Sequence, residues 1–109
     1  MNSIGYFQLD NLIRGRIPML FLNFDVDLKP WYGPLEKIHL GTWAIASTRE
    51  NYYELLQERQ APTDFGIIVL CPDGELSKAI AEELIQKGHT NTYWVDGGFA
   101  ELERQKQSE

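Results

Sequence analysis

The stretch that decides the fold is residues 67–87, IIVLCPDGELSKAIAEELIQK. It opens with the apolar run Ile67–Cys71, and a short β-branched run of this kind is typical of a buried strand. It closes with Ser77–Lys87, where apolar residues recur every three or four positions as on an amphipathic helix. Gly88 follows, where a left-handed C-terminal cap belongs. The stretch therefore predicts a strand, a loop and a helix in succession.

The same alternation continues on both sides of this unit. Strands are expected at Ile4–Phe7, Met19–Phe24 and Thr92–Val95, and helices at Gln8–Arg14, Thr48–Gln60 and from Phe99 to about Gln105. Residues 27–47 carry prolines, glycines and aromatic residues, so we expect a loop or a short strand there. Buried-type strands that alternate with helices predict an α/β fold with a largely parallel sheet. No repeat or linker divides the chain, so residues 1–109 are expected to form a single domain.

Composition excludes several function classes. The 109 residues include 10 Lys and Arg against 16 Asp and Glu, which gives a net charge of −6. A surface of this sign repels a phosphate backbone, so general nucleic-acid binding is not expected. The longest apolar runs fall far short of the roughly 20 residues that cross a membrane. The first residues lack the basic start and apolar stretch of a signal peptide, so a cytoplasmic protein is expected.

The chain has a single cysteine, Cys71. One thiol cannot form an intrachain disulfide or a Cys-x-x-Cys redox couple. With only two histidines, a His/Cys metal cluster is not expected either. We therefore expect no metal and no cofactor.

Cys71 ends the best strand, and the loop after it leads directly into the best helix. In such an arrangement, the loop amides and the free N–H groups of the helix start converge on one point and form an anion-binding nest. A thiolate placed there is stabilised by these amides and by the helix dipole. Gly74 permits a backbone angle that other residues resist. The pattern fits a nucleophilic cysteine, and the alternative is that Cys71 is a small apolar residue that closes the strand.

The motif Cys71-x-x-Gly74-x-x-Ser77, between an apolar strand and an amphipathic helix, resembles the active-site loop of rhodanese-like sulfurtransferases. Residues 93–98, YWVDGG, are similar to the final strand of that family, which ends in Gly-Gly. Residues 24–26, FDV, are similar to an earlier strand end. The resemblance spans nearly the whole chain. It implies the family's fold, a parallel sheet of about five strands with helices on both faces.

The resemblance also implies a reaction. The cysteine takes the sulfane sulfur of a small donor, becomes a persulfide, and passes the sulfur to a thiol acceptor, possibly a protein. It makes Cys71 the catalytic nucleophile, and it makes the loop that follows the cradle for substrate sulfur: Pro72, Asp73, Gly74, Glu75, Leu76 and Ser77. Related phosphatases and arsenate reductases have a longer loop that ends in an arginine clamp, whereas Ser77 stands at the sixth position here. Phosphatase chemistry is therefore disfavoured.

The sequence departs from the family pattern at several positions. Asp27 replaces an arginine, residues 41–43 replace small residues, and Leu102 stands where tryptophan is usual. The loop is also acidic, because Asp73 and Glu75 lie within it, and carboxylates close to the thiol oppose a thiolate and repel a doubly charged donor. Thiosulfate is therefore expected to be a poor donor, unless both side chains point into solvent. These departures leave open a second reading, a rhodanese-like binding or redox-regulatory module that transfers no sulfur.

Several other polar and aromatic residues are expected to be structural. His39 lies in an aromatic-rich segment and is read as a packing residue. Asp25 is expected to bond nearby backbone at a strand end. The aromatic residues Trp31, Tyr32 and Trp43 are expected to cover the sheet, with an exposed docking patch as the alternative.

Overall fold

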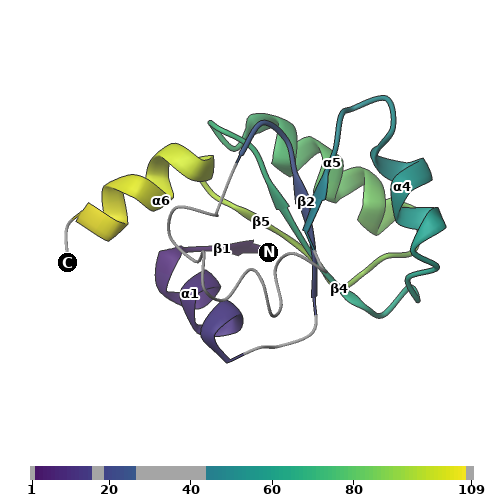
Figure 1. Cartoon of the computed structure of the whole chain (residues 1–109), viewed down its shortest axis with the longest axis horizontal. Helices are drawn as coiled ribbons and strands as arrows, with labels where there is room; N and C mark the ends of the chain where they lie inside the picture. The colour runs from purple at the N-terminus through teal and green to yellow at the C-terminus, as the bar shows by residue number, and fades with distance from the viewer. Residues whose placement is uncertain (1, 16–18, 27–43, 108–109) are drawn as a thin grey trace.

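The computed structural model describes residues 2–15, 19–26 and 44–107. In this part of the chain, five strands form one sheet in the order β1-β5-β4-β2-β3, and every neighbouring pair is parallel. The strands are β1 (Ser3–Ile4), β2 (Met19–Asn23), β3 (Ala44–Ala46), β4 (Gly66–Leu70) and β5 (Thr92–Val95) (Figure 1). The central strand β4 is buried along its whole length, as its uninterrupted apolar sequence predicts.

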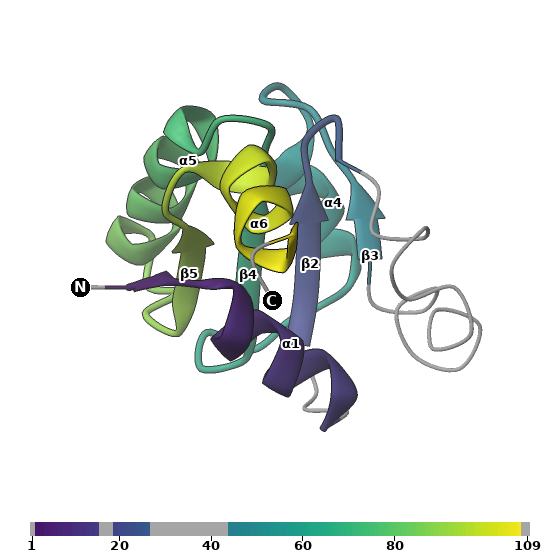
Figure 2. The same cartoon turned by 90° about the vertical axis from the view of Figure 1, so that its left-hand side faces the viewer.

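Helices cover both faces of the sheet. They are α1 (Tyr6–Arg14), α4 (Tyr52–Glu58), α5 (Glu75–Gln86) and α6 (Gly98–Gln107). Figure 2 shows α1 and α6 on one face of the sheet and α4 and α5 on the other. The expected class is confirmed: the chain has an α/β fold with an all-parallel five-stranded sheet, an arrangement consistent with the rhodanese-like fold.

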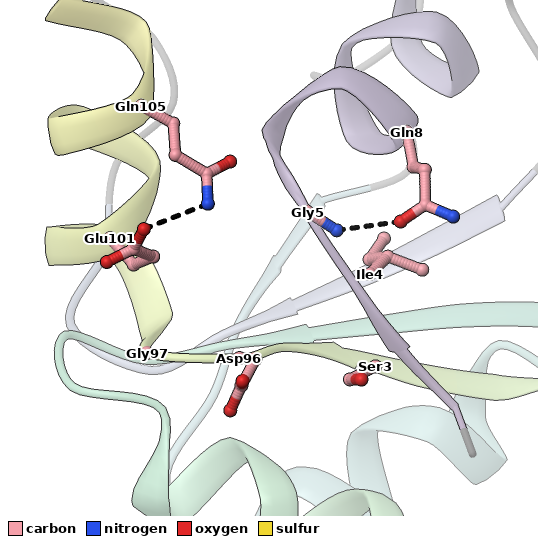
Figure 3. Close-up of a pocket in the computed structure, with 8 residues that line it drawn as sticks. All are labelled: Ser3, Ile4, Gly5, Gln8, Asp96, Gly97, Glu101 and Gln105. Atoms are coloured by element: carbon pink, nitrogen blue, oxygen red, sulfur yellow. Dashed lines mark hydrogen bonds between the residues drawn. The ribbon is translucent and has the colours of Figure 1, made fainter. Parts of the chain in front are cut away.

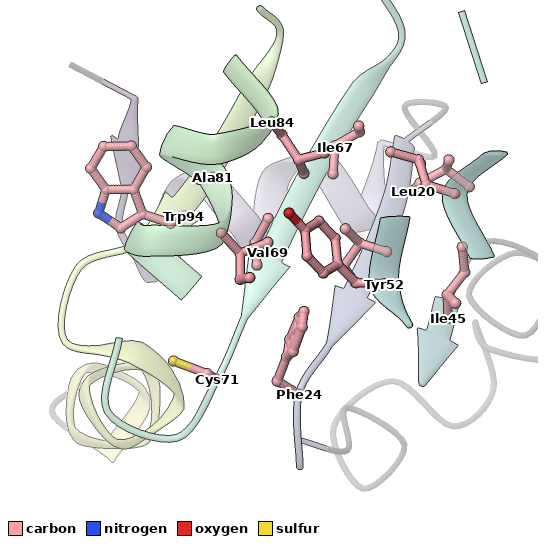
Figure 4. Close-up of a cluster of buried hydrophobic side chains, with 13 residues drawn as sticks. Leu20, Phe24, Ile45, Tyr52, Ile67, Val69, Cys71, Ala81, Leu84 and Trp94 are labelled. Atoms are coloured by element: carbon pink, nitrogen blue, oxygen red, sulfur yellow. The ribbon is translucent and has the colours of Figure 1, made fainter. Parts of the chain in front are cut away.

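Two apolar clusters hold these layers together. Side chains alternate along each strand, so successive residues of β4 face opposite clusters: Ile67 and Val69 one, Ile68 and Leu70 the other. The first cluster joins the sheet to α4 and α5, and it includes Cys71 (Figure 4). The second joins the sheet to α1 and α6, and Leu102 is completely buried in it. Leucine at this position thus fills a core site.

Several boundaries differ from those predicted. Strand β1 is only two residues long, and the segment expected to extend it, through Phe7, is already helical. The reason is local: Gln8 Oε1 accepts a hydrogen bond from the Gly5 N–H at 2.8 Å, so the two residues form a capping interaction that starts α1 early. Helix α4 is shorter than expected at both ends. Its N-cap is Asn51 rather than Thr48.

Thr48 and Asn51 instead close a turn before α4. Asn51 N–H donates to Thr48 Oγ1 at 3.2 Å, and Thr48 N–H donates to Asn51 Oδ1 at 2.7 Å. Each side chain thereby satisfies the other residue's backbone, which displaces the helix start by one turn. Helix α5 begins earlier than expected, at Glu75, because Gly74 adopts a φ of 88° and turns the chain directly into the helix.

The helices that follow β4 and β5 leave the carboxyl ends of these neighbouring strands in opposite directions. Helix α5 follows β4 and packs on one face, whereas α6 follows the neighbouring strand β5 and packs on the other. In α/β proteins, ligands bind at the carboxyl ends of parallel strands, beside loops that leave adjacent strands toward opposite faces. Cys71 and the Gly97-Gly98 turn lie at this point. In the part of the chain that the structure describes, no helix has the length and apolar content needed to span a bilayer.

Candidate active site

The loop after β4 bends around the sulfur atom of Cys71. Two backbone N–H groups donate to Sγ: that of Gly74 at 3.1 Å and that of Ser77 at 3.2 Å. Ser77 lies in the first turn of α5, where backbone N–H groups have no partner within the helix. The sulfur therefore occupies the position of an anion at a helix N-terminus. The residue is only 1% exposed.

Ser77 contributes its side chain as well as its backbone. It is completely buried, and its Oγ lies 3.2 Å from Cys71 Sγ, where it accepts the thiol hydrogen. The same hydroxyl donates to the Gly74 carbonyl at 3.1 Å. A hydroxyl both donates and accepts, so Ser77 can satisfy the sulfur in either protonation state by rotating its O–H bond.

The Gly97-Gly98 turn packs against the Cys71 loop. The φ of Gly74 is 88°, and a Cβ there would lie 2.7 Å from the backbone nitrogen of Gly98 and 2.9 Å from that of Gly97. A Cβ on Gly98 would in turn lie 2.7 Å from the carbonyl carbon of Asp73. The two backbones thus touch directly, which only glycines allow.

Hydrogen bonds from the start of helix α6 also hold the Cys71 loop against the Gly97-Gly98 turn. Phe99 N–H donates to the Cys71 carbonyl at 2.9 Å, and Ala100 N–H donates to the Pro72 carbonyl at 3.0 Å. Backbone N–H groups in the first turn of α6 therefore hold the Cys71 loop in place. Sequence reasoning missed this function of the Gly97-Gly98 turn, although two consecutive glycines after a buried strand are a signal of close backbone approach.

The two acidic residues of the loop are placed differently. Asp73 Oδ1 accepts a hydrogen bond from the Glu75 N–H at 3.0 Å and lies 3.8 Å from Cys71 Sγ. The Asp73 side chain is solvent-exposed overall, but its carboxylate turns back over the sulfur. Glu75 is exposed. The alternative that both carboxylates point away from the thiol therefore does not hold for Asp73.

The remaining loop residues, Pro72 and Leu76, support the loop, and within the described part of the chain neither donates a hydrogen bond to the sulfur. Pro72 is exposed, and its carbonyl is the acceptor for α6. Leu76 is half-buried and packs against the cluster that contains Cys71. Of the predicted site residues, the structure brings the amides of Gly74 and Ser77, the Ser77 hydroxyl and the Asp73 carboxylate to within 4 Å of the sulfur.

Other residues singled out in the sequence are not part of this cluster. Asp25 is exposed and adopts a left-handed backbone with a φ of 57°, a conformation that aspartate tolerates at a strand end. The following predicted residues lie outside the described part of the chain: Asp27, Trp31, Tyr32, His39, residues 41–42 and Trp43. Among the described residues, no group of three His, Cys, Asp or Glu side chains is placed to hold a metal ion.

An open pocket of about 580 Å³ lies beside the Cys71 loop, between β1, α1 and the start of α6 (Figure 3). Most of its polar groups already pair with one another. Gln105 Nε2 donates to Glu101 at 2.9 Å, and Gln105 Oε1 accepts from the Tyr6 N–H at 2.9 Å. The Cys71 sulfur does not line this pocket, and the bond from Tyr6 to Gln105 ties α1 to α6. We therefore assign the pocket a structural role.

No protein-family model matches this chain, and no curated protein matches it significantly.

Proposed function

We propose that this protein is a sulfurtransferase that carries sulfane sulfur as a persulfide on Cys71. The observation that carries the proposal is the pair of backbone N–H groups, from Gly74 and Ser77, that converge on Sγ at 3.1 and 3.2 Å. Donors aimed at one sulfur atom stabilise negative charge on it, which both the attacking thiolate and the persulfide require. The rigid backing by Gly97 and Gly98 supports the proposal, because it holds these donors in place before a substrate arrives.

The reaction consists of two displacements at sulfur. The Cys71 thiolate attacks the outer sulfur of a persulfide, R–S–SH, and a new S–S bond forms as the donor's S–S bond breaks. The electron pair of the broken bond leaves with R–S⁻, and the protein becomes Cys71–S–SH. A nucleophilic acceptor, such as a thiolate or cyanide, then takes the outer sulfur and restores the Cys71 thiolate. Neither step changes the number of electrons in the system, so no external oxidant or reductant is needed.

Nucleophile activation in this scheme needs no separate general base. The thiol ionises to solvent before attack, and the loop supplies donors that hold the resulting thiolate. When the thiol proton leaves, the Ser77 hydroxyl, 3.2 Å from the sulfur, can turn to donate to it. The proposal places the protein in a reducing compartment such as the cytoplasm, where a lone thiol remains available.

Intact-mass measurement tests this function. Reduced wild-type protein is incubated with an uncharged alkyl persulfide, and the Cys71→Ser variant is treated identically. We expect wild type to gain the mass of one sulfur atom and the variant to gain none, because serine cannot form a persulfide. A folded, reduced wild-type protein that gains no sulfur would refute the proposal.

The low exposure of Cys71 favours a second candidate. A thiol that is 1% exposed meets small reagents slowly, which suits a rhodanese-like module that binds a partner or senses redox state without transferring sulfur. The same mass measurement separates the two functions, because a module of this kind acquires no sulfur that an acceptor can remove.

A further inference from the structure

We propose that Asp73 determines donor specificity by acting as a built-in anion in the Cys71 loop, so that the site takes sulfur from persulfides that carry no oxyanion group and rejects oxyanion donors. The inference rests on the proposed sulfurtransfer and names the substrate class. It starts from the way the loop's N–H groups are distributed among acceptors. Gly74 and Ser77 donate to Cys71 Sγ, whereas the Glu75 N–H, between them in sequence, donates to the Asp73 carboxylate at 3.0 Å.

The Asp73 carboxylate thus occupies an amide that an incoming anion would use. A loop of this shape is an anion nest, and an anionic donor gains affinity from each free N–H group in it. Here Oδ1 is already bound to the Glu75 N–H and lies only 3.8 Å from the sulfur that a donor must reach. An approaching sulfonate would have to break this hydrogen bond and approach a like charge at contact distance.

Glu75 provides the internal comparison. It carries the same charge in the same loop, but the structure gives its carboxylate no hydrogen bond to a loop amide or to the sulfur, and it is exposed to solvent. Both side chains are exposed, so solvent screens both charges; they differ in that the Asp73 carboxylate lies 3.8 Å from the sulfur, where it faces an incoming donor. Neutralising Asp73 and neutralising Glu75 change the net charge of the loop equally. Comparing the two substitutions therefore separates the effect of the position of the Asp73 carboxylate from the effect of net charge.

Two donors test this specificity: thiosulfate, which carries an oxyanion group, and an alkyl persulfide, which carries none. With thiosulfate, the Cys71 thiolate takes the outer sulfur and sulfite leaves with the electron pair of the broken S–S bond. The total charge is the same before and after: a thiolate and a dianion become a persulfide anion and a dianion. With the alkyl persulfide, the donor brings no oxyanion into the loop. The ratio of the two loading rates therefore measures discrimination against the anion.

The experiment measures this ratio by intact mass in wild type, Asp73→Asn, Asp73→Ala, Glu75→Gln and Glu82→Gln. Asp73→Asn keeps an oxygen that can accept from the Glu75 N–H and removes the charge, whereas Asp73→Ala removes both. Glu82→Gln removes one charge from an exposed position further along α5. We expect both Asp73 variants to raise the ratio of the thiosulfate rate to the persulfide rate by at least about tenfold. We expect a clearly smaller thiosulfate gain from Glu75→Gln and none from Glu82→Gln.

Each other outcome counts against the inference. Equal gains from Asp73→Asn and Glu75→Gln would show that net charge, and not the placement of Asp73, controls the donor. An unchanged ratio in both Asp73 variants would overturn the role of Asp73 while leaving sulfurtransfer intact, because wild type would still load from the persulfide. If no protein gains sulfur from either donor, the proposed function fails and the role of Asp73 fails with it.

Discussion

Gly98 is the residue at which the two turns around Cys71 meet. A side chain there would collide with the backbone of Asp73, and the φ of 69° already disfavours any residue with a Cβ. We expect Gly98→Ala to lower the free energy of unfolding by about 1–3 kcal/mol, since both strain and displacement contribute. The shifted loop should also slow persulfide loading by at least about tenfold, because displacements near 1 Å have effects of that size. Denaturant unfolding and loading followed by intact mass measure the two effects.

Gly88→Ala is the matched control for this prediction. Gly88 has a φ of 105°, but a Cβ there meets only ordinary contact, at 3.9 Å from Thr63. The substitution should cost about 1 kcal/mol through backbone strain alone and leave the loading rate unchanged. If Gly98→Ala loads sulfur as fast as Gly88→Ala, the turn does not support the site.

At the residue scale, the sequence predicted the parts of the site that depend on local order. Cys71 at a strand end, Gly74 in the loop and Ser77 at the start of a helix follow from spacing alone. The contact between Gly74 and Gly98 does not, because these residues are distant in sequence and only the sheet order brings them together. Nor could spacing show that the Asp73 carboxylate accepts from the Glu75 N–H and lies 3.8 Å from the sulfur, although both acidic side chains are exposed.

Helix α6 is the element that ties the sheet to the Cys71 loop. It is anchored by Leu102, which is completely buried, while its first amides bond the Cys71 and Pro72 carbonyls. We expect Leu102→Ala to lower the free energy of unfolding by about 2–5 kcal/mol, the usual range for emptying a leucine site. Denaturant unfolding measures this change. Glu103→Ala, at an exposed position on the same helix, should change stability by less than about 0.5 kcal/mol. Equal effects of the two substitutions would mean that α6 is not docked through this face.

Helices α4 and α5 are joined by a titratable contact. The Tyr52 hydroxyl donates to Glu83, and burial, followed by this hydrogen bond, raises the pKa of Tyr52 to about 12 from 10.0. The folded state therefore holds the phenol proton more tightly than the unfolded state, so the contribution to stability is complete below pH 10 and is lost as pH rises toward 12.

The corresponding test compares wild type with Tyr52→Phe. Stability measured by denaturant unfolding should fall more steeply with pH between pH 10 and about 12 in wild type than in the variant. Parallel profiles for the two proteins over that range would contradict the assigned pKa shift.

At the element scale, sequence patterns succeeded where the interactions are short-range. The ranges of β5 and most of α5 agree with the expected ones, because an apolar run or stripe defines each. The predicted start of a helix at Thr48 was too early, because Thr48 and Asn51 pair reciprocally in a turn that precedes α4, and a single-residue rule does not detect such a pair. The start of α1 was missed for a similar reason, since Gln8 closes a capping interaction on Gly5.

The whole molecule brings its chemistry together through topology. The parallel sheet, with its order β1-β5-β4-β2-β3, sends the loops after β4 and β5 to opposite faces, and Cys71 lies between them. Alternating strands and helices indicated the α/β class and the parallel sheet. The strand order depends on long-range packing, which hydrophobic periodicity does not encode, so it was not predicted. The count of about five strands, with helices on both faces, was expected only through the resemblance to rhodanese-like proteins.

The central claim, that Cys71 passes sulfur through a persulfide, is tested most directly by a single-turnover chase. Wild-type protein is loaded from an uncharged alkyl persulfide, freed of donor and mixed with cyanide, and the Cys71→Ser variant is carried through the same steps. We predict that each loaded chain releases one thiocyanate and returns to its unmodified mass, while the variant releases none. A loaded chain that keeps its sulfur, or a variant that releases as much thiocyanate as wild type, would contradict the account.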